Sequence, residues 1–524
     1  MNQTISSKTI RSVIAASSVG TMIEWYDFYI FGSLANVIST KFFPDTNPVV
    51  ALLSTLATFA AGFVVRPFGA LFFGRLGDLI GRKYTFLVTL ILMGLSTFLI
   101  GCIPSYKTIG FVAPLLVLLL RLLQGLALGG EYGGAATYVA EHAPTNKRGF
   151  WTSWIQTTAT IGLFISLLVI ILTKGAMSEK SFDEWGWRVP FWISIIMVAI
   201  SVVIRMRMHE SPLFAKIKAE GKTSVNPLKE SFGHKLNFKF VLLALFGATM
   251  GQGVVWYTGQ FYALSFIQTT LSVDVSQASK LIMWAILFAT PFFVVFGGLS
   301  DRIGRKWIML GGMLLAIICY RPIYTAMFES GSVSHKTEIT DQTKTNFMAV
   351  ADGTAGDSIK TTTILKTYTD GTTFKQTRTE KVHVDITKAD PKKDIKTTKS
   401  VKLDNHSFWM LVLLVFIQVL FVTMVYGPIA AFLVEMFPVK IRYTSMSLPY
   451  HIGNGIFGGL LPAIALFLTT KASEANVAAA KAGQAVVPYD KPYLEGLWYP
   501  IIIAAVCFVI GALYINGKDN RIDD

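Results

Sequence analysis

Long runs of apolar residues, separated by short polar segments, dominate the chain. A helix of about 20 apolar residues is long enough to cross the hydrocarbon layer of a membrane. We therefore expect a membrane-spanning helix in each of twelve runs, and an all-α membrane protein as the fold class. The runs lie near 12–38, 50–74, 84–104, 112–140, 150–173, 188–206, 239–268, 278–299, 307–328, 407–434, 444–469 and 496–516.

A basic polar segment halfway along the chain separates the first six predicted spans from the last six. Residues 1–206 are expected to form an N-terminal six-helix bundle, and residues 207–238 a cytoplasmic connecting loop. The C-terminal six-helix bundle is expected to comprise residues 239–328 and 405–524. The sequence therefore predicts two bundles of equal helix number.

A second polar segment, residues 329–404, lies between spans 9 and 10 and contains no long apolar run. Val382, Val384 and Ile386 alternate with polar residues, and Asp370-Gly371 has the composition of a tight hairpin turn. We predict an extracytoplasmic, β-rich insert here. A disordered polar loop is the alternative, because a segment rich in Thr and Lys is also typical of solvated chain.

Composition and charge exclude an ordinary soluble protein. Hydrophobic residues make up 52% of the chain and charged residues 15%, with a mean hydropathy of +0.51, whereas soluble domains carry about a quarter charged residues. The net charge of +15 could suit a nucleic-acid binder, but Lys and Arg follow the predicted topology: 22 lie in cytoplasmic segments and 9 in short external loops. We expect a multi-pass protein of the bacterial inner membrane, with both termini in the cytoplasm and no nucleic-acid partner.

An internal repeat relates the two bundles. Residues 74–83 and 297–306 follow spans 2 and 8 and are identical at seven of ten positions, at an offset of 223. A second pair, residues 141–144 and 435–438, is offset by 294. The difference of 71 residues is close to the length of the insert. The chain is therefore predicted to be two parallel copies, with the insert added to the second.

Several short motifs occur along the chain: two Asp-x-x-Gly-Arg-Lys loops, residues 24–28 (Glu-Trp-Tyr-Asp-Phe), residues 66–69 (Arg-Pro-Phe-Gly), and residues 121–125 followed by 129–133. Together, in their order along the chain, they resemble the metabolite:proton symporter family of the major facilitator superfamily. The resemblance covers nearly all of the chain except the insert, and it implies two six-helix bundles rocking about a midplane site. Residues 252–260 resemble a shikimate-type or uncharacterised branch of the family, whereas residues 103–114 resemble α-ketoglutarate permeases, so the sequence leaves the substrate open.

Ionisable residues inside the predicted spans are the first candidates for the transport site, because burying a charge in hydrocarbon costs at least ~2.5–3.5 kcal/mol. Glu24 and Asp27 lie three apart, on one face of span 1. Two neighbouring carboxylates favour proton uptake near neutral pH, so we expect proton coupling from at least one. Pairing with an arginine, which would lock two helices, is the alternative for either.

Arginines within the spans are candidates for binding a carboxylate, because a guanidinium forms bidentate hydrogen bonds and stays charged. Arg121 is favoured for this role, with Arg66 and Glu131 nearby in the predicted site; structural ion pairs are the alternatives. Arg321 is expected to reach the external interface. Polar and aromatic residues are expected to complete the cavity: Tyr26, Gln124, Trp256, Tyr257, Gln260, Tyr450, His451 and Asn454.

Charged residues around the repeated loops are predicted to form a cytoplasmic gate. Acidic and basic residues recur at matching repeat positions, which plain positive-inside anchoring does not explain. A charge network between the bundles would hold the cytoplasmic side closed. The predicted gate residues are Arg75, Asp78, Arg82, Glu141, Arg148, Asp301, Arg305, Glu435 and Arg442.

The sequence therefore favours proton-coupled symport of a small polar metabolite, specifically an organic acid such as a dicarboxylate. Uptake of a zwitterionic osmolyte such as proline or betaine is one alternative, and a transporter-like sensor with a ligand-binding insert is another. No enzyme motif, nucleotide-binding loop or metal-ligand spacing is present, and the three cysteines lie apart in apolar runs. We expect no catalytic residues, no metal, no cofactor and a functional monomer.

Overall fold

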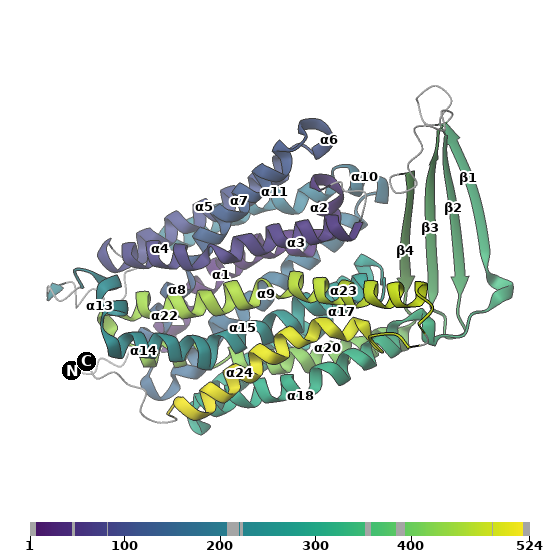
Figure 1. The fold of residues 1–524 in the computed structure, drawn as a ribbon. Coiled ribbons are helices and arrows are strands. Elements are labelled where there is room, and N and C mark those ends of the chain that lie inside the picture. The colour runs from purple at the N-terminus through teal and green to yellow at the C-terminus, as the bar shows by residue number, and fades with distance from the viewer. Residues whose placement is uncertain are drawn as a thin grey trace.

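The computed structural model describes residues 7–43, 48–80, 82–206, 219–220, 224–351, 358–383, 394–484 and 486–516. Long helices run side by side in one bundle, and a β-sheet stands at one end of it (Figure 1). The N- and C-terminal ends of the chain lie at the opposite end of the bundle.

The first half of the chain forms the helices of one bundle. The third, fifth and sixth predicted spans are single helices, whereas the first, second and fourth are each divided into two segments, at Leu34, at Val65 and at Gly130–Glu131. The helices are α1 (Ser7–Ser33), α2 (Ala35–Phe42), α3 (Pro48–Val64), α4 (Arg66–Ile80), α5 (Arg82–Cys102), α6 (Tyr106–Ile109), α7 (Val112–Gly129), α8 (Tyr132–His142), α9 (Arg148–Gly175), α10 (Glu179–Glu184) and α11 (Val189–Met206).

The second half repeats this arrangement and adds π-helical segments within its seventh and eleventh spans. A short helix, α13 (Pro227–Gly233), lies in the predicted connecting loop, of which residues 207–218 and 221–223 fall outside the described part. The remaining elements are α14 (Lys235–Ala244), η3 (Leu245–Thr249), α15 (Met250–Tyr257), η4 (Thr258–Tyr262), α16 (Ala263–Thr269), α17 (Val275–Ile303), α18 (Arg305–Gly331), α20 (Asn405–Tyr426), α21 (Ile429–Met436), α22 (Arg442–His451), η9 (Ile452–Gly458), α23 (Leu461–Lys481) and α24 (Trp498–Tyr514).

The helical membrane fold is confirmed. Among the described residues, ten continuous helical stretches are long and apolar enough to cross a membrane. The other two predicted spans are helical as well: α1 has 27 residues and α5 has 21, of which Leu87–Cys102 is an apolar stretch.

Glycines allow the backbones of α3 and α4 to pack directly against the backbone of α7. A Cβ atom on Gly125 would lie 1.7 Å from the carbonyl oxygen of Gly62, and one on Gly129 would lie 2.2 Å from that of Arg66. Only a residue without a side chain fits at such distances. This packing brings Arg66 and Arg121 into the interior of the N-terminal bundle.

The insert is β-rich, as predicted, and forms a four-stranded antiparallel sheet in the order β1-β2-β3-β4. The strands are β1 (Lys344–Ala351), β2 (Ser358–Thr367), β3 (Thr373–Val382) and β4 (Ile395–Lys402). Asp370-Gly371 forms the predicted turn between β2 and β3, where Gly371 adopts φ +89°. Val382 ends β3, whereas Val384 and Ile386 lie outside the described residues.

Hydrogen bonds fix the sheet to the C-terminal bundle. The Val401 amide of β4 donates to the carbonyl oxygen of Ser272 (2.8 Å), and the Asp274 amide donates back to that of Val401 (2.9 Å). The ammonium of Lys336 pairs with Asp370 and with Asp404 (3.2 Å), the N-cap of α20. Burial alone would raise the pKa of Asp404, but hydrogen bonds from Ser407 and the charge of Lys336 hold it well below its usual range.

Candidate functional site

A pocket at the centre of the bundle, which we call the central pocket, is lined by side chains of both halves. Its empty space, including the part open to solvent, is about 240 Å³. Two of its ionisable side chains, Glu24 and Arg66, come from α1 and α4, and Glu131 precedes α8. The remaining lining residues are Thr21, Trp25, Leu128, Tyr132, Tyr450 and His451, the last two from α22.

Arg66 is fully buried beside this pocket without an ionic or hydrogen-bonded partner of normal geometry. None of its three guanidinium nitrogens makes such a bond within the described residues. Its guanidinium carbon lies 4.0 Å from the ring centre of Phe63, 4.6 Å from that of Phe28 and 5.5 Å from that of Trp25. Aromatic faces attract a cation, but they do not replace the lost hydrogen bonds. The arrangement therefore leaves a buried cation available to an anionic group.

Arg121 is held differently, by groups of its own bundle. Its Nη1 donates to Gln124 (2.7 Å) and its Nη2 to the carbonyl oxygen of Phe59 (3.3 Å), while the Gln124 amide donates to Thr97 (2.6 Å). The guanidinium also lies 4.2 Å from the ring centre of Phe28. Of the two predicted arginines, Arg66 rather than Arg121 lines the central pocket.

Asp27 faces α11 rather than Arg121. Its Oδ1 accepts a hydrogen bond of 2.5 Å from Ser194, and its Oδ2 has no hydrogen bond within the described residues. The neighbouring Tyr26 also turns toward α11, since its hydroxyl donates to the carbonyl oxygen of Pro190 (2.8 Å). In this conformation Asp27 forms no ion pair with Arg121, so the alternative of a structural pair between them is not seen, and Tyr26 lies outside the residues lining the central pocket.

Stacked rings, which we call the aromatic cluster, separate the central pocket from the other end of the bundle. The cluster comprises Trp25 and Tyr29 of α1, Trp256 of α15 and Phe261 of η4. Tyr29 stacks on Trp25 at a centroid distance of 5.0 Å and on Trp256 at 5.6 Å. The Tyr29 hydroxyl, the Trp256 Nε1 and both amide atoms of the adjacent Gln260 are buried without hydrogen bonds in the described part of the chain. Buried polar groups are normally paired, so these atoms indicate a ligand-binding region.

A second pocket, the outer pocket, lies beyond the aromatic cluster and encloses about 420 Å³ counted to its open mouth. Phe261 lines it from the cluster side, and Ser265 and Thr269 of α16 line its wall. Across it, the Asn36 amide of α2 donates to Gln268 of α16 (3.0 Å) and links the two bundles.

Tyrosines of α8, α20 and α22 and amides of α15 and η9 connect the central pocket to the C-terminal bundle. The rings of Tyr132 and Tyr450 stack at 3.6 Å, and the Tyr450 hydroxyl is 2.8 Å from that of Tyr426. Gln252 and Asn454 exchange two hydrogen bonds, of 3.0 and 2.9 Å. The structure thus brings predicted site residues of both halves together. The ring centre of Tyr257, for example, lies 5.2 Å from that of Phe63.

Residues that the sequence analysis missed are Tyr29, Tyr132, Tyr426 and Ser194. Tyr29 carried a usable signal, because it lies one helical turn after Trp25 and therefore on the same face of α1. Ser194 carried none, since its contact with Asp27 joins residues 167 positions apart. Predicted Arg321 lies away from this site, 3.7 Å from Glu495 and over the ring of Trp498.

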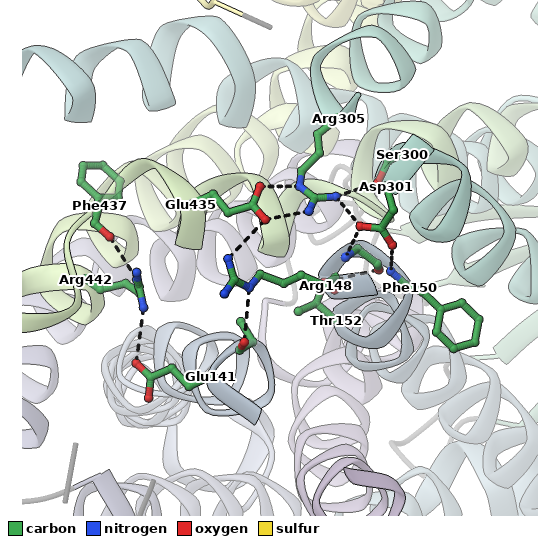
Figure 2. Close-up of polar contacts among 12 residues, drawn as sticks. Glu141, Arg148, Phe150, Thr152, Ser300, Asp301, Arg305, Glu435, Phe437 and Arg442 are labelled. Carbon is green, nitrogen blue, oxygen red and sulfur yellow. Dashed lines mark hydrogen bonds and ion pairs between the residues drawn. The ribbon is translucent and has the colours of Figure 1, made fainter. Parts of the chain in front are cut away.

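Ion pairs join the bundles at the end that holds the repeated loops (Figure 2). Glu435 of α21 accepts from Arg305 at 2.6 and 2.7 Å and from Arg148 of α9 at 3.3 Å. Arg442 of α22 pairs with Glu141 of α8 at 3.7 Å. Arg148 and Glu141 belong to the N-terminal bundle, whereas their partners belong to the C-terminal one, so both contacts cross between the halves.

Asp301 completes this network by capping a helix of the other bundle. Its two carboxylate oxygens accept from the backbone amides of Gly149 and Phe150 at the start of α9, each at 2.8 Å, and Arg305 donates to it at 2.8 Å. A carboxylate at a helix N-terminus is favoured by the free amides and by the helix dipole. The predicted gate side chains of Asp78 and Arg82 lie outside the described residues, and Arg75 is exposed.

Two helical halves, a pocket lined by both of them beside a buried cation, and ion pairs that join them at one end are an arrangement typical of membrane transporters. The chain belongs to the Sugar (and other) transporter family, whose profile matches residues 13–350. The family is one of transporters and not of enzymes, as the sequence predicted.

Relatives of known name differ in substrate. The chain is 36% identical to the proline/betaine transporter of Escherichia coli K12 over 324 residues, covering 59% of this chain and 63% of that protein, which is less than two thirds of its length. It is 28% identical to the alpha-ketoglutarate permease of the same strain over 516 residues, covering 98% and 96%. The inner membrane metabolite transport protein YhjE of that strain is 36% identical over 329 residues, covering 61% and 73%.

Among solved structures, the major facilitator superfamily proton:xylose symporter XylE is similar with a TM-score of 0.62 at 14% identity, covering 99% of this chain and 98% of that one. A partially occluded, inward-open structure of XylE from E. coli has the same TM-score and identity. At this identity the likeness establishes the fold alone, and it confirms the predicted major facilitator arrangement.

Proposed function

We propose that the protein is a proton-coupled symporter that takes up a small organic acid, such as a dicarboxylate. The observation that carries the proposal is the buried guanidinium of Arg66, which lies at the central pocket without an ion-pair partner or a hydrogen bond of normal geometry among the described residues. A substrate carboxylate would supply the missing acceptors in a bidentate geometry. Similarity to the alpha-ketoglutarate permease over 98% of the chain supports the same class.

In this proposal the substrate moves by alternating access between the two sides of the central pocket. The aromatic cluster closes the pocket toward the outer pocket, and the ionic network around Glu435 closes the opposite end. Rocking of the two bundles would open one barrier at a time. The cytoplasmic gate therefore comprises Arg148, Asp301, Arg305 and Glu435, together with the pair of Glu141 and Arg442.

Asp27 is the proposed proton carrier. It is a buried carboxyl group held by one short hydrogen bond from Ser194 and by no cation within the described residues. Protonation would neutralise it, and release of the proton would restore a charge within the N-terminal bundle beside α11. Since Arg121 lies in the same bundle, a change of helix packing could bring the two charges together in another conformation and link proton release to substrate release.

A zwitterionic osmolyte is the second candidate, and a separate observation favours it. The faces of Trp25, Tyr29 and Trp256 stack beside the site, and aromatic faces bind quaternary ammonium groups. The carboxylate of such a substrate would use Arg66 in the same way. Similarity to the proline/betaine transporter supports this alternative.

We further propose that the protein lies in the bacterial inner membrane as a functional monomer, with both termini in the cytoplasm and the insert outside. The distribution of Lys and Arg supports this orientation, and a relative is named as an inner membrane protein.

Counterflow in proteoliposomes tests the function. Vesicles loaded with unlabelled 2-oxoglutarate, proline or betaine are exposed to the labelled compound, and alkalinisation of the external medium is recorded during net uptake. We expect 2-oxoglutarate to exchange and to consume external protons. The Arg66→Lys variant should lose at least tenfold in apparent affinity, because an ammonium cannot form two parallel hydrogen bonds, whereas the control Arg321→Lys should not. Exchange of proline and betaine alone would refute the organic-acid assignment.

A further inference from the structure

The charges of the insert are segregated between its strands and its turns. The four strands contain nine Lys or Arg residues and one acidic residue, Glu380. Acidic residues of the insert instead lie mainly in the connections, as Asp370 does. The basic residues of the strands are Lys344, Lys360, Lys366, Lys375, Arg378, Lys381, Lys396, Lys399 and Lys402.

Both faces of the sheet carry this charge. The register places Lys344, Lys375 and Lys396 on one face, and Lys360 and Lys399 on the other. The register places none of these cations directly opposite another, and Lys360 lies opposite Glu380, so the sheet tolerates this charge. Lys344, Lys360, Lys396 and Lys399 are exposed and therefore contribute to the field around the sheet.

The basic sheet lies at the entrance of the outer pocket. In Figure 1 the strands cross the end of the helical bundle, with β4 nearest to the helices and β1 farthest from them. Val401 of β4 bonds to Ser272, only three residues beyond Thr269, which lines the outer pocket. Of the four strands, β4 is therefore the one that lies nearest to the outer pocket.

Cations of the other bundle extend the same field. The pKa of Lys41, at the end of α2, is lowered first by burial and then by the charges of Lys107, Lys396 and Arg188, while Asp183 opposes them. Lys396 of β4 thus acts electrostatically on the N-terminal bundle, although its own strand is fixed to the C-terminal one. Cations of the insert and of the N-terminal bundle thus lie close enough to act on one another at this end of the molecule.

We propose that the insert is an electrostatic collector, which raises the concentration of small anions at the outer pocket. The inference rests on the proposed external position of the insert and on the proposed uptake of an organic acid. A basic rim beside a pocket increases the local concentration of an oppositely charged ligand, and the increase vanishes with added salt. A dianion gains the square of what a monoanion gains, and a zwitterion gains nothing.

The size of the effect follows from Coulomb's law. Two cations that each lie about 10 Å from an anion in water without salt raise the local concentration of a monoanion by about fourfold and that of a dianion by about fifteenfold. At ~0.1 M salt the Debye length of about 10 Å reduces these factors to about 1.7-fold and about threefold.

The experiment compares two matched double variants. Lys396→Gln with Lys399→Gln removes two exposed charges of β4, one from each face, beside the entrance. Lys344→Gln with Lys360→Gln removes two exposed charges, again one from each face, on β1 and β2. Strand spacing places β1 about 14 Å farther out than β4.

The local potential is read without any assumption about the substrate. In full-length protein whose three native cysteines are replaced by Ser, a cysteine at Ser265 in the outer pocket reacts with an anionic or a cationic methanethiosulfonate reagent. In ~0.1 M salt we expect the β4 variant to react about twofold more slowly with the anionic reagent and faster with the cationic one, and the β1–β2 variant to change less. If each reagent reacted with both double variants at the same rate as with the parent protein, the collector would be overturned.

Uptake then connects the potential to transport. At substrate concentrations far below KM, 2-oxoglutarate uptake by the β4 variant should fall about threefold in ~0.1 M salt and should match the parent protein in ~1 M salt. Unchanged 2-oxoglutarate uptake would overturn the collector while leaving organic-acid transport intact. Uptake of betaine only would refute the organic-acid proposal, and it would also remove the collector's role, because a zwitterion has no net charge to attract.

Discussion

The carboxylate of Glu435 is the centre of the ionic network, and its removal tests whether that network is a gate. Glu435→Gln keeps the shape of the side chain and one acceptor oxygen but removes the charge that Arg305 and Arg148 share. The three side chains are 12% to 26% exposed, so solvent screens the pairs only in part. We expect the closed cytoplasmic side to be weakened while the helices still insert and pack.

The magnitude follows from the hydrogen bonds. A bond to a charged group contributes about 1.5–3 kcal/mol net. Glu435 accepts three, two from Arg305 at 2.6 and 2.7 Å and a longer one of 3.3 Å from Arg148. Because the glutamine retains an acceptor and water reaches the rim, we take the net loss as about 2 kcal/mol. That loss shifts the ratio of closed to open cytoplasmic side by roughly 30-fold.

The assay is labelling of a buried reporter from the cytoplasmic face. Ser153 of α9 lies at the contact with Gly297 of α17, so a cysteine at position 153 reacts only when these helices separate. In inside-out vesicles, Glu435→Gln should raise its reaction rate with an impermeant maleimide by roughly 30-fold. The control Glu474→Gln removes an exposed pair with Lys471 and should change nothing. An unchanged rate in Glu435→Gln would refute the gate.

Three further results are expected. Asp27→Asn should retain 2-oxoglutarate exchange but lose uphill accumulation driven by a pH gradient, and retained accumulation would exclude Asp27 as the proton carrier. A cysteine at Thr363 should react with an impermeant thiol reagent in intact cells, whereas protection would overturn the external position of the insert. The pKa of Asp404 is lowered in the folded insert, so the ionised carboxylate stabilises the insert fully above about pH 4, and this stabilisation is lost as the pH falls below that. Amide exchange of β4, corrected for intrinsic rates, should therefore accelerate at low pH. The acceleration should be smaller in Asp404→Asn.

Local requirements explain what could be predicted from the sequence. A helix that crosses hydrocarbon must be apolar over its whole length, so the spans are visible as runs of residues. The hairpin at Asp370-Gly371 was predictable because a tight turn needs a residue that tolerates positive φ, and Gly371 adopts it. The residues of the network around Glu435 were predictable from the repeat. Two similar bundles that face each other bring equivalent helix ends, and the charges at those ends, close together.

Contacts between helices decided the rest. Whether Asp27 faces Ser194 or Arg121 depends on the rotation and depth of α1 against α7 and α11, and a run of apolar residues contains no information on either. The backbone contact at Gly125 sets how deeply Arg121 is buried, and the stacking of Tyr29 on Trp256 joins residues 227 positions apart in the sequence. The sequence thus determined which residues cross the membrane and which charges they carry into it. Only the tertiary structure determined which of those charges are paired, because pairing requires side chains of separate helices to reach the same depth and the same face.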